Sequence, residues 1–213
     1  MYDFVIFDLD GTLVDSQRDI TSAVNSVRKE FNFAPLSIGQ VRSFLGSGIK
    51  SLIERSVPCG NGKVCADDAV ERFKFYYAKC LTDTTKAYGG ITEMLDDLKD
   101  VKKAVLSNKT EIFSREILER LGILKYFSYV WGGDTIGVKK PDPQPILDLV
   151  KNSGISAAKT IMIGDSANDF KAAKSAGVAC AAVMYGYSTA GQIAEFKPDF
   201  LIQKPSEIAQ IVL

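Results

Sequence analysis

The sequence predicts an α/β protein, built as a doubly wound parallel (Rossmann-like) sheet that is interrupted by an inserted all-α domain. The chain opens with an unbroken apolar run, Phe4–Phe7, which is typical of a strand buried on both faces of a parallel sheet. Strand and helix patterns alternate in the second part of the chain. The stretch between these two parts shows helical spacing alone, so we expect it to be an insertion.

The insertion is expected over residues 16–85, which leaves residues 1–15 and 86–213 to form the α/β part. Ser16 is a candidate cap for the first helix of the insertion. Proline and glycine breaks then separate shorter helical stretches, of which the last runs from Asp67 to Cys80. No strand pattern occurs between the two boundaries.

The second part of the chain alternates between apolar strand-like runs and helical stretches. Three of its helices are expected to end at a glycine that is followed by an apolar residue, at Gly122, Gly154 and Gly177. This repetition is typical of βαβ units and a parallel sheet. The predicted strands after the first are Lys103–Leu106, Tyr129–Trp131, Thr160–Ile163, Val178–Val183 and Phe200–Ile202.

Composition excludes several classes of protein. The 213 residues include 26 basic and 26 acidic side chains, so the net charge is zero and no dedicated nucleic-acid surface is expected. No apolar run approaches the ~18 residues that span a membrane, and no signal peptide is visible, so a cytoplasmic location is expected by default. The four cysteines are expected to be reduced structural thiols, with a clip between Cys59 and Cys65 as the minor alternative.

The chain contains no histidine. This absence excludes Ser-His-Asp and Cys-His catalysis and histidine-based zinc sites, and it leaves acid–base chemistry to other side chains. Two glycine-rich stretches also fail as phosphate loops: Gly46–Ser51 lacks the third glycine of a dinucleotide loop, and Gly62-Lys63 is followed by Val64 rather than by Ser or Thr.

Chemistry-bearing side chains gather at the predicted strand ends. Because the carboxyl ends of parallel strands meet at one edge of a sheet, these side chains can converge. Carboxylates suit a hard cation such as Mg²⁺, and a lysine with a hydroxyl suits a phosphoryl group. Taken alone, the first of these strand ends could equally be a plain Asp-Gly turn. The residues are Asp8, Asp10, Ser107, Asn108, Lys140, Asp165 and Asp169.

Four motifs in this set resemble those of the haloacid dehalogenase superfamily. Asp8–Ser16, with the sequence Asp-Leu-Asp-Gly-Thr-Leu-Val-Asp-Ser, resembles the first motif, and Ser107-Asn108 resembles the second. Lys140–Pro143 resembles the third, and Gly164–Asp169 resembles the fourth. All four occur in the expected order and span nearly the whole chain, which makes the resemblance specific.

The resemblance implies a phosphatase mechanism that passes through an aspartyl-phosphate. Asp8 would be the nucleophile, and Asp10 would protonate the leaving oxygen and then take a proton from water. Lys140 would offset the charge of the phosphate and the nucleophile. The resemblance also implies a Mg²⁺ ion held by the Asp8 carboxylate, the main-chain carbonyl of Asp10 and Asp165, with Asp169 supporting the metal shell.

The same resemblance assigns phosphate contacts to Thr12, Ser107 and Asn108. Asp169 has an alternative interpretation, as a helix N-terminal charge favoured by the helix dipole. Lys139, beside the motif lysine, is expected to be a solvated surface residue. The helical insertion resembles the small α-helical cap of this superfamily, so the expected fold carries an inserted all-α cap domain that closes over small substrates.

Within the superfamily, the resemblance favours phosphoglycolate phosphatases. An acid at position 10 favours phosphate esters over halides, and the lack of histidine disfavours a sugar phosphomutase. A phosphonatase would need a Schiff-base lysine, for which Lys50 is the near candidate. Leu45–Leu52 resembles the cap specificity loop of the phosphoglycolate phosphatases, although an interhelical turn with solvated charges is the alternative. The cap residues with a candidate substrate role are Gly46, Gly48, Lys50, Arg42 and Arg55.

We therefore expect a Mg²⁺-dependent phosphatase that hydrolyses a small phosphomonoester resembling 2-phosphoglycolate. Pyrophosphate, nucleotides and sugar phosphates are alternative substrates, because cap loops set this choice. A non-catalytic phosphate-binding regulatory domain is the alternative of a different class. The expected partner is a small phosphate ester, with no nucleic acid and no membrane, and the sequence carries no signal for oligomeric state.

Overall fold

The computed structural model describes residues 1–58 and 65–213. Within this part the chain divides into two compact units, one of residues Met1–Asp15 and Ala87–Leu213, and one of residues Ser16–Lys86. We call them the α/β unit and the helical unit. None of the helices in the described residues is both long enough and apolar enough to cross a membrane.

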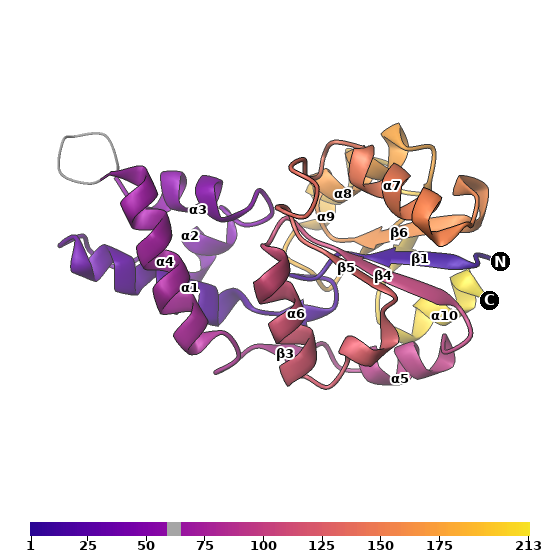
Figure 1. Cartoon of the computed structure of the whole chain (residues 1–213), viewed down its shortest axis with the longest axis horizontal. Helices are drawn as coiled ribbons and strands as arrows, with labels where there is room; N and C mark the ends of the chain where they lie inside the picture. The colour runs from indigo at the N-terminus through magenta and orange to yellow at the C-terminus, as the bar shows by residue number, and fades with distance from the viewer. Residues whose placement is uncertain (59–64) are drawn as a thin grey trace. The chain divides into compact units, whose positions relative to one another are not determined.

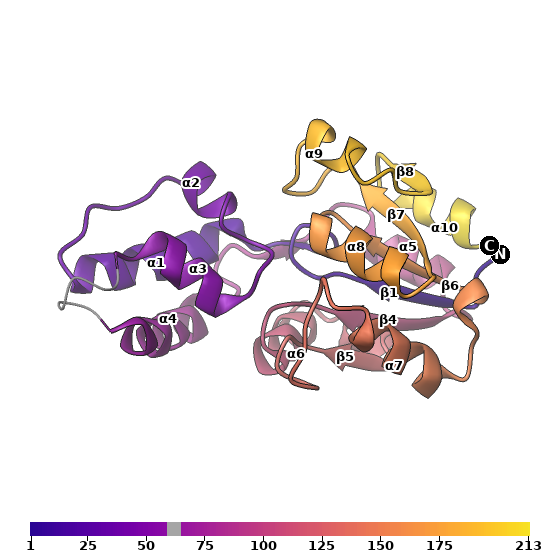
Figure 2. The ribbon, with the colours of Figure 1, turned by 90° about the horizontal axis from the view of Figure 1, so that it is seen from above.

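The α/β unit is built on a six-stranded parallel sheet, which confirms the predicted fold class (Figures 1 and 2). The strands lie in the order β5-β4-β1-β6-β7-β8, so the opening strand is central, as expected of a run buried on both faces. The strands are β1 (Phe4–Phe7), β4 (Lys102–Leu106), β5 (Tyr129–Trp131), β6 (Thr160–Gly164), β7 (Ala179–Val183) and β8 (Phe200–Ile202).

Helices cover both faces of this sheet (Figure 1). On one face α7 (Gln144–Ser153) and α8 (Ala167–Ser175) pack against alternate strand residues such as Phe4, Ile6 and Met162. The other face carries α5 (Ile91–Asp97), α6 (Glu111–Arg120) and α10 (Ser206–Val212).

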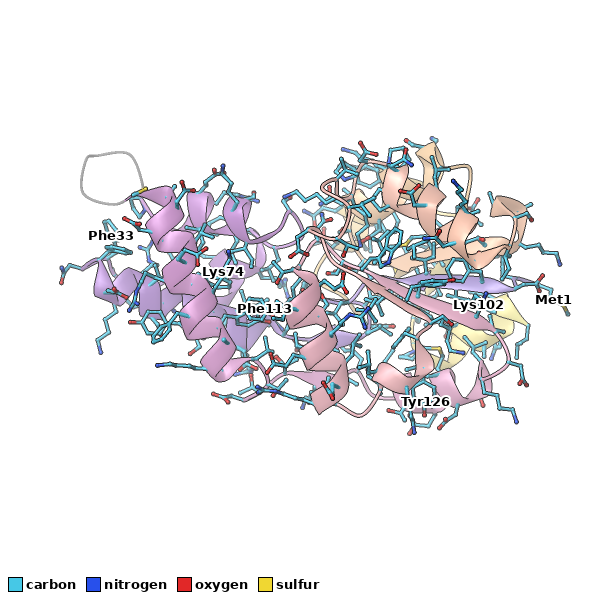
Figure 3. The ribbon with its side chains drawn as sticks, viewed as in Figure 1. Met1, Phe33, Lys74, Lys102, Phe113 and Tyr126 are labelled. Atoms are coloured by element: carbon cyan, nitrogen blue, oxygen red, sulfur yellow. The ribbon has the colours of Figure 1, made fainter. Side chains whose placement is uncertain are left out.

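The loops of the α/β unit hold three further short helices. These are α9 (Ala190–Ala194) and the 3-10 helices Leu124–Tyr126 and Ala157–Lys159. In one of them the Tyr126 hydroxyl, on the α5 side of the unit, donates to Asp96 at 2.6 Å (Figure 3).

The parallel register places all strand starts at one edge of the sheet and all strand ends at the other. Phe4 of β1 is paired with Lys102 of β4 and with Thr160 of β6, and Phe7 is paired with Val105 and Ile163. The residues that follow Phe7, Leu106 and Gly164 therefore emerge at one edge, which is the arrangement on which the predicted site depends.

Some predicted element ends were wrong by a residue or two, and some short elements were missed. The strand predicted from Val178 begins at Ala179, and the helix predicted from Asp67 begins at Ala66. The helix α9 and two short strands, β2 (Val14–Asp15) and β3 (Lys86–Ala87), were not predicted. Two-residue strands carry no periodicity from which to predict them.

The predicted glycine ends of α6, α7 and α8 are confirmed. Gly122, Gly154 and Gly177 all have φ between 67° and 71°, in the left-handed region where glycine lacks the steric penalty of other residues. In contrast, the prediction that Ser16 caps the first helix with its side chain was wrong. Ser16 stands at the cap position, but its side chain makes no capping hydrogen bond.

The helical unit contains α1 (Gln17–Glu30), α2 (Ile38–Arg42), α3 (Ile49–Ser56) and α4 (Ala66–Cys80). No strand lies between α1 and α4 in its described residues, as the periodicity predicted. The clip between Cys59 and Cys65 stays a prediction, because Cys59 lies outside the described residues. The helices share an apolar core that includes Val24, Val27, Ile53, Phe73 and Tyr77.

A buried carboxylate ties the start of α1 to the end of the helical unit. Asp19 is 2% exposed, and its two oxygens accept hydrogen bonds from the main-chain N–H and the hydroxyl of both Thr84 and Thr85, at 2.6–3.1 Å. Burial alone would raise the pKa of Asp19, but these hydrogen bonds outweigh it and lower that pKa. The network fixes the segment through which the chain leaves the unit.

We expect Asp19→Ala to lower the free energy of unfolding by about 3 kcal/mol, because it leaves buried donors of Thr84 and Thr85 without acceptors. Urea denaturation measures the change. The control is Glu54→Ala, which removes an exposed carboxylate of α3 and should change the free energy by less than about 0.5 kcal/mol. Equal effects of the two substitutions would contradict the assigned role of Asp19.

Candidate active site

The carboxylate of Asp8 lies at the end of the central strand and is paired with a buried lysine. Asp8 directly follows β1, and its main-chain N–H donates to Ile163 O at 2.9 Å, which continues the ladder to β6. The Lys140 ammonium lies 2.9 Å from Asp8 Oδ1 and 2.6 Å from Asp169 Oδ1. Lys140 also donates to Leu106 O at the end of β4. One lysine therefore connects three strand ends or loops of the carboxyl edge.

Three buried carboxylates face one another at this edge. Oxygen atoms of Asp8, Asp165 and Asp169 all lie within 4.8 Å of one another. Lys140 is paired with this cluster. When all four side chains are ionised, the three carboxylates and the lysine carry a formal charge of −2. Such a buried excess of negative charge is unfavourable unless a cation joins it or a proton is taken up.

The pKa values of these groups show the same imbalance. The pKa of Asp8 is raised to about 7: burial is the largest cause, the carboxylates of Asp169 and Asp10 add to the rise, and Lys140 opposes it. Burial, together with the charges of Asp8 and Asp169, also raises the pKa of Asp165 well above its ordinary value. Burial alone would lower the pKa of Lys140, but the neighbouring carboxylates outweigh it and raise that pKa.

Asp169 serves two elements at once. One of its oxygens binds Lys140, and the other accepts from the main-chain N–H of Ser166 at 3.0 Å and from the Ser166 hydroxyl at 2.7 Å. This is a capping box at the start of α8. The helix N-terminal interpretation of Asp169 is therefore confirmed, both of its oxygens are engaged within the protein, and its metal-supporting role stays a prediction.

The residues predicted to contact phosphate lie around the ends of β1 and β4. Thr12, Ser107 and Asn108 are all buried, and the Asn108 amide donates to the main-chain oxygen of Lys140 at 2.8 Å. The Thr12 hydroxyl has no hydrogen-bond partner among the described residues. A buried hydroxyl in this state costs free energy, so it points to a ligand that supplies the missing bond.

Asp10 is held by a lysine to which the sequence analysis gave no role. Lys109 is buried, and its ammonium lies 2.9 Å from Asp10 Oδ1, while the Asp10 side chain is 20% exposed. Lys109 directly follows the predicted pair Ser107-Asn108, so position was the available signal. A lysine after a strand end, however, is more often a solvated residue.

A second missed group is the main-chain N–H of Tyr187, which donates to Asp165 Oδ2 at 2.6 Å. Gly11 approaches the same carboxylate from β1, because a Cβ at Gly11 would lie 2.4 Å from Asp165 Oδ2. These are backbone contacts, and residue types at strand ends do not signal them.

The candidate cap residues lie in the helical unit. Gly46 and Gly48 have φ of 97° and 85°, and Gly48 directly precedes α3, so this stretch is a turn between α2 and α3. Arg42 and Lys50 are exposed, and the Arg55 guanidinium lies 4.7 Å from the centre of the Phe44 ring. A substrate role for these residues stays a prediction.

The donor set fits a hard divalent cation. The cluster offers carboxylate oxygens, which Mg²⁺ prefers. Together with Lys140 it carries a formal charge of −2, which the +2 charge of the ion would neutralise. Asp8 and Asp165 are the residues best placed to bind it, because Asp169 is already engaged by Lys140 and Ser166. The arrangement thus offers carboxylate oxygens for a cation next to the pair of Asp8 and Lys140.

Comparison with known proteins places the chain in a family. Residues 5–183 match the haloacid dehalogenase-like hydrolases. The chain is 39% identical over 205 residues to phosphoglycolate phosphatase 1 of Pseudomonas aeruginosa, covering 93% of this chain and 75% of the relative. It is 35% identical over 211 residues to the phosphoglycolate phosphatase of Aquifex aeolicus, covering 98% and 95%.

A solved structure shows the same likeness. The crystal structure of a predicted phosphoglycolate phosphatase from Haemophilus somnus superposes with a TM-score of 0.94 at 31% identity, covering 100% of this chain and 98% of that one. The match therefore extends over both units as well as over the four motifs. The chain belongs to the haloacid dehalogenase-like hydrolases, as a phosphoglycolate phosphatase-like enzyme.

Proposed function

We propose that the protein is a Mg²⁺-dependent phosphatase that hydrolyses a small phosphomonoester resembling 2-phosphoglycolate, through an aspartyl-phosphate intermediate. The observation that carries the proposal is the buried cluster of Asp8, Asp165 and Asp169 around Lys140, with its excess of two negative charges. The names of the relatives support the substrate class.

In this proposal Mg²⁺, when bound, neutralises the cluster and draws charge from the phosphate oxygens. Asp8 and Asp165 would hold it through their carboxylates and Asp10 through its main-chain carbonyl, while Asp169 holds Lys140 in place. Lys140, already paired with Asp8, also offsets the charge of the phosphate. The hydroxyls of Thr12 and Ser107 and the amide of Asn108 bind the remaining phosphate oxygens.

The reaction then has two steps. An oxygen of Asp8 attacks the phosphorus, the ester P–O bond breaks, and Asp10 gives a proton to the leaving oxygen. A water molecule next attacks the phosphorus of the aspartyl-phosphate and gives a proton to Asp10. Inorganic phosphate leaves and Asp8 is regenerated. Lys109, whose ammonium lies 2.9 Å from Asp10 Oδ1, orients the Asp10 side chain and pairs with its carboxylate once the proton has been given up.

We further propose that the helical unit acts as a cap that closes over the substrate and excludes water. The turn at Gly46–Gly48 would then contact the part of the substrate beyond the phosphate. The exposed charges of Arg42 and Lys50 suit a substrate that carries a carboxylate as well as a phosphate.

The substrate class is tested with a panel of phosphate esters in the presence of Mg²⁺. We expect 2-phosphoglycolate to give the highest kcat/KM, at least about tenfold above glucose 6-phosphate, pyrophosphate and AMP. A tenfold ratio corresponds to a difference of about 1.4 kcal/mol in transition-state stabilisation, which a few contacts to the substrate can supply. Hydrolysis should stop when EDTA removes the metal. A sugar phosphate or nucleotide at the head of the ranking would contradict the proposed substrate.

The roles of the two aspartates are separated by the leaving group. We expect Asp10→Asn to lower kcat on 2-phosphoglycolate by about 10²-fold or more, and on p-nitrophenyl phosphate by less than about tenfold, because a good leaving group needs no proton. Asp8→Asn should abolish turnover of both. Lys139→Met, which changes an exposed lysine next to Lys140, is the control and should leave both rates unchanged.

Equal losses on the two esters would argue against an acid role for Asp10. Full activity of Asp8→Asn would remove the aspartyl-phosphate from the mechanism. The comparison for Asp10→Asn requires an ester with a poor leaving group that the protein turns over, whereas the Asp8→Asn result can be measured with p-nitrophenyl phosphate alone.

We expect the affinity for Mg²⁺ to fall about tenfold per pH unit below pH 7, because the ion must displace a proton from the cluster. The raised pKa of Asp8 destabilises the metal-free fold progressively as pH rises from about 4 to 7, so Mg²⁺ restores more stability at pH 8 than at pH 6. Titration calorimetry and the Mg²⁺-induced shift in Tm measure both effects. A Mg²⁺ affinity that is the same at pH 6 and pH 8 would contradict the prediction.

A further inference from the structure

The loop that follows β7 reaches across to the candidate metal cluster. It consists of Tyr185, Gly186 and Tyr187, and none of these residues belongs to the four motifs. The main-chain N–H of Tyr187 donates to Asp165 Oδ2 at 2.6 Å, so this loop takes one oxygen of a carboxylate that the proposed function assigns to Mg²⁺. A short N–H···O⁻ bond of this kind is among the stronger hydrogen bonds of proteins.

Gly186 lets the loop come this close. A Cβ at this position would lie 2.4 Å from Asp165 Cβ and 2.5 Å from the main-chain oxygen of Gly11. Neither of these atoms belongs to the far end of a flexible side chain, so no small movement makes room. Gly186 therefore lies wedged between the carboxylate at the end of β6 and the turn that follows β1.

Tyr185 and Tyr187 also contact the segment that follows β1 through their hydroxyls. The Tyr185 hydroxyl donates to the main-chain oxygen of Thr12 at 3.2 Å, and burial raises the pKa of Tyr185, which keeps this hydroxyl a donor. The Tyr187 hydroxyl lies 3.5 Å from Asp15 Oδ1. The Tyr185 ring also lies 4.9 Å, centre to centre, from the ring of Tyr88, which follows β3.

We propose that residues 185–187 are a positioning element for the cation site. The loop holds Asp165 at a fixed place relative to the turn that carries Asp8, Asp10 and Thr12, and it thereby sets the affinity for the divalent cation. This inference rests on the proposed function. A loop outside the four motifs would thus keep Asp165 and the turn after β1 in a fixed relative position.

The test compares Gly186→Ala with Gly191→Ala. The control position lies in α9, where a Cβ would meet no atom within 4 Å. Titration calorimetry with MgCl₂, without substrate, should show a Kd at least about tenfold higher for Gly186→Ala, because the added methyl displaces Asp165 or the β1 turn. Gly191→Ala should bind Mg²⁺ as the wild-type protein does.

A purely structural role would give a different result. Gly186→Ala would then lower Tm without metal but leave the Kd for Mg²⁺ within about twofold of the wild-type value, and this would overturn the proposal. Tyr185→Phe, which removes only one hydroxyl, keeps the test decisive if Gly186→Ala fails to fold. We expect it to raise the Kd several-fold, and an unchanged Kd in a folded Tyr185→Phe protein would also count against the proposal.

The failure of this inference is distinguishable from the failure of the proposed function. If the wild-type protein binds no Mg²⁺, the metal-dependent mechanism falls and the inference falls with it. If the wild-type protein binds Mg²⁺ and both loop variants bind it equally well, the inference alone is overturned. Activity measured as a function of Mg²⁺ concentration supplies a second readout. A displaced Asp165 should raise the Mg²⁺ concentration for half-maximal activity more than it lowers kcat at saturating Mg²⁺.

Discussion

The excess of buried negative charge at the end of β1 is the constraint on which the rest of the site depends. Three carboxylates within 4.8 Å of one another would repel strongly in a low-dielectric environment. Lys140 compensates for one charge, and two remain. The remaining negative charge must be neutralised by protons or by a divalent cation. The raised pKa values of Asp8 and Asp165 show that protons are held more tightly in the absence of a cation.

The same constraint explains why Asp169 is anchored so firmly. Its two oxygens are engaged by Lys140 and by Ser166, which begins the capping box of α8. The helix N-terminus favours a negative charge there, and Asp169 in turn holds Lys140 against Asp8. The start of a helix thus stabilises the lysine that is paired with Asp8, the proposed nucleophile. Stability of the fold and preparation of the site share one side chain.

Much of the fold and of this cluster could be predicted from the sequence. Asp8, Lys140, Asp165 and Asp169 are close because a parallel sheet brings strand ends to one edge, and residue types at strand ends are visible in a sequence. The left-handed glycines after three helices were visible for a similar reason, since their backbone conformation selects the residue type.

What could not be predicted depends on loop conformation rather than on residue type. The ion pair of Lys109 with Asp10 depends on the conformation of the segment after β4, and the residue type of Lys109 does not reveal that conformation. The hydrogen bond to Asp165 comes from the main-chain N–H of Tyr187, so any residue except proline could supply it at that position. The two-residue strands β2 and β3 and the unused cap at Ser16 likewise depend on tertiary contacts.

The turn after β1 depends both on residue type, which is visible in the sequence, and on loop conformation, which is not. Its sequence, Asp10-Gly11-Thr12, contains the proposed acid and a proposed phosphate-binding hydroxyl, and the helical unit begins only a few residues later, at Ser16. Main-chain hydrogen bonds among residues 9–14 close this turn, and Lys109 holds the Asp10 carboxylate at 2.9 Å. Contacts from the loop at residues 185–187 connect the same turn to Asp165, and on the inference proposed above this loop after β7 belongs to the site together with the motifs.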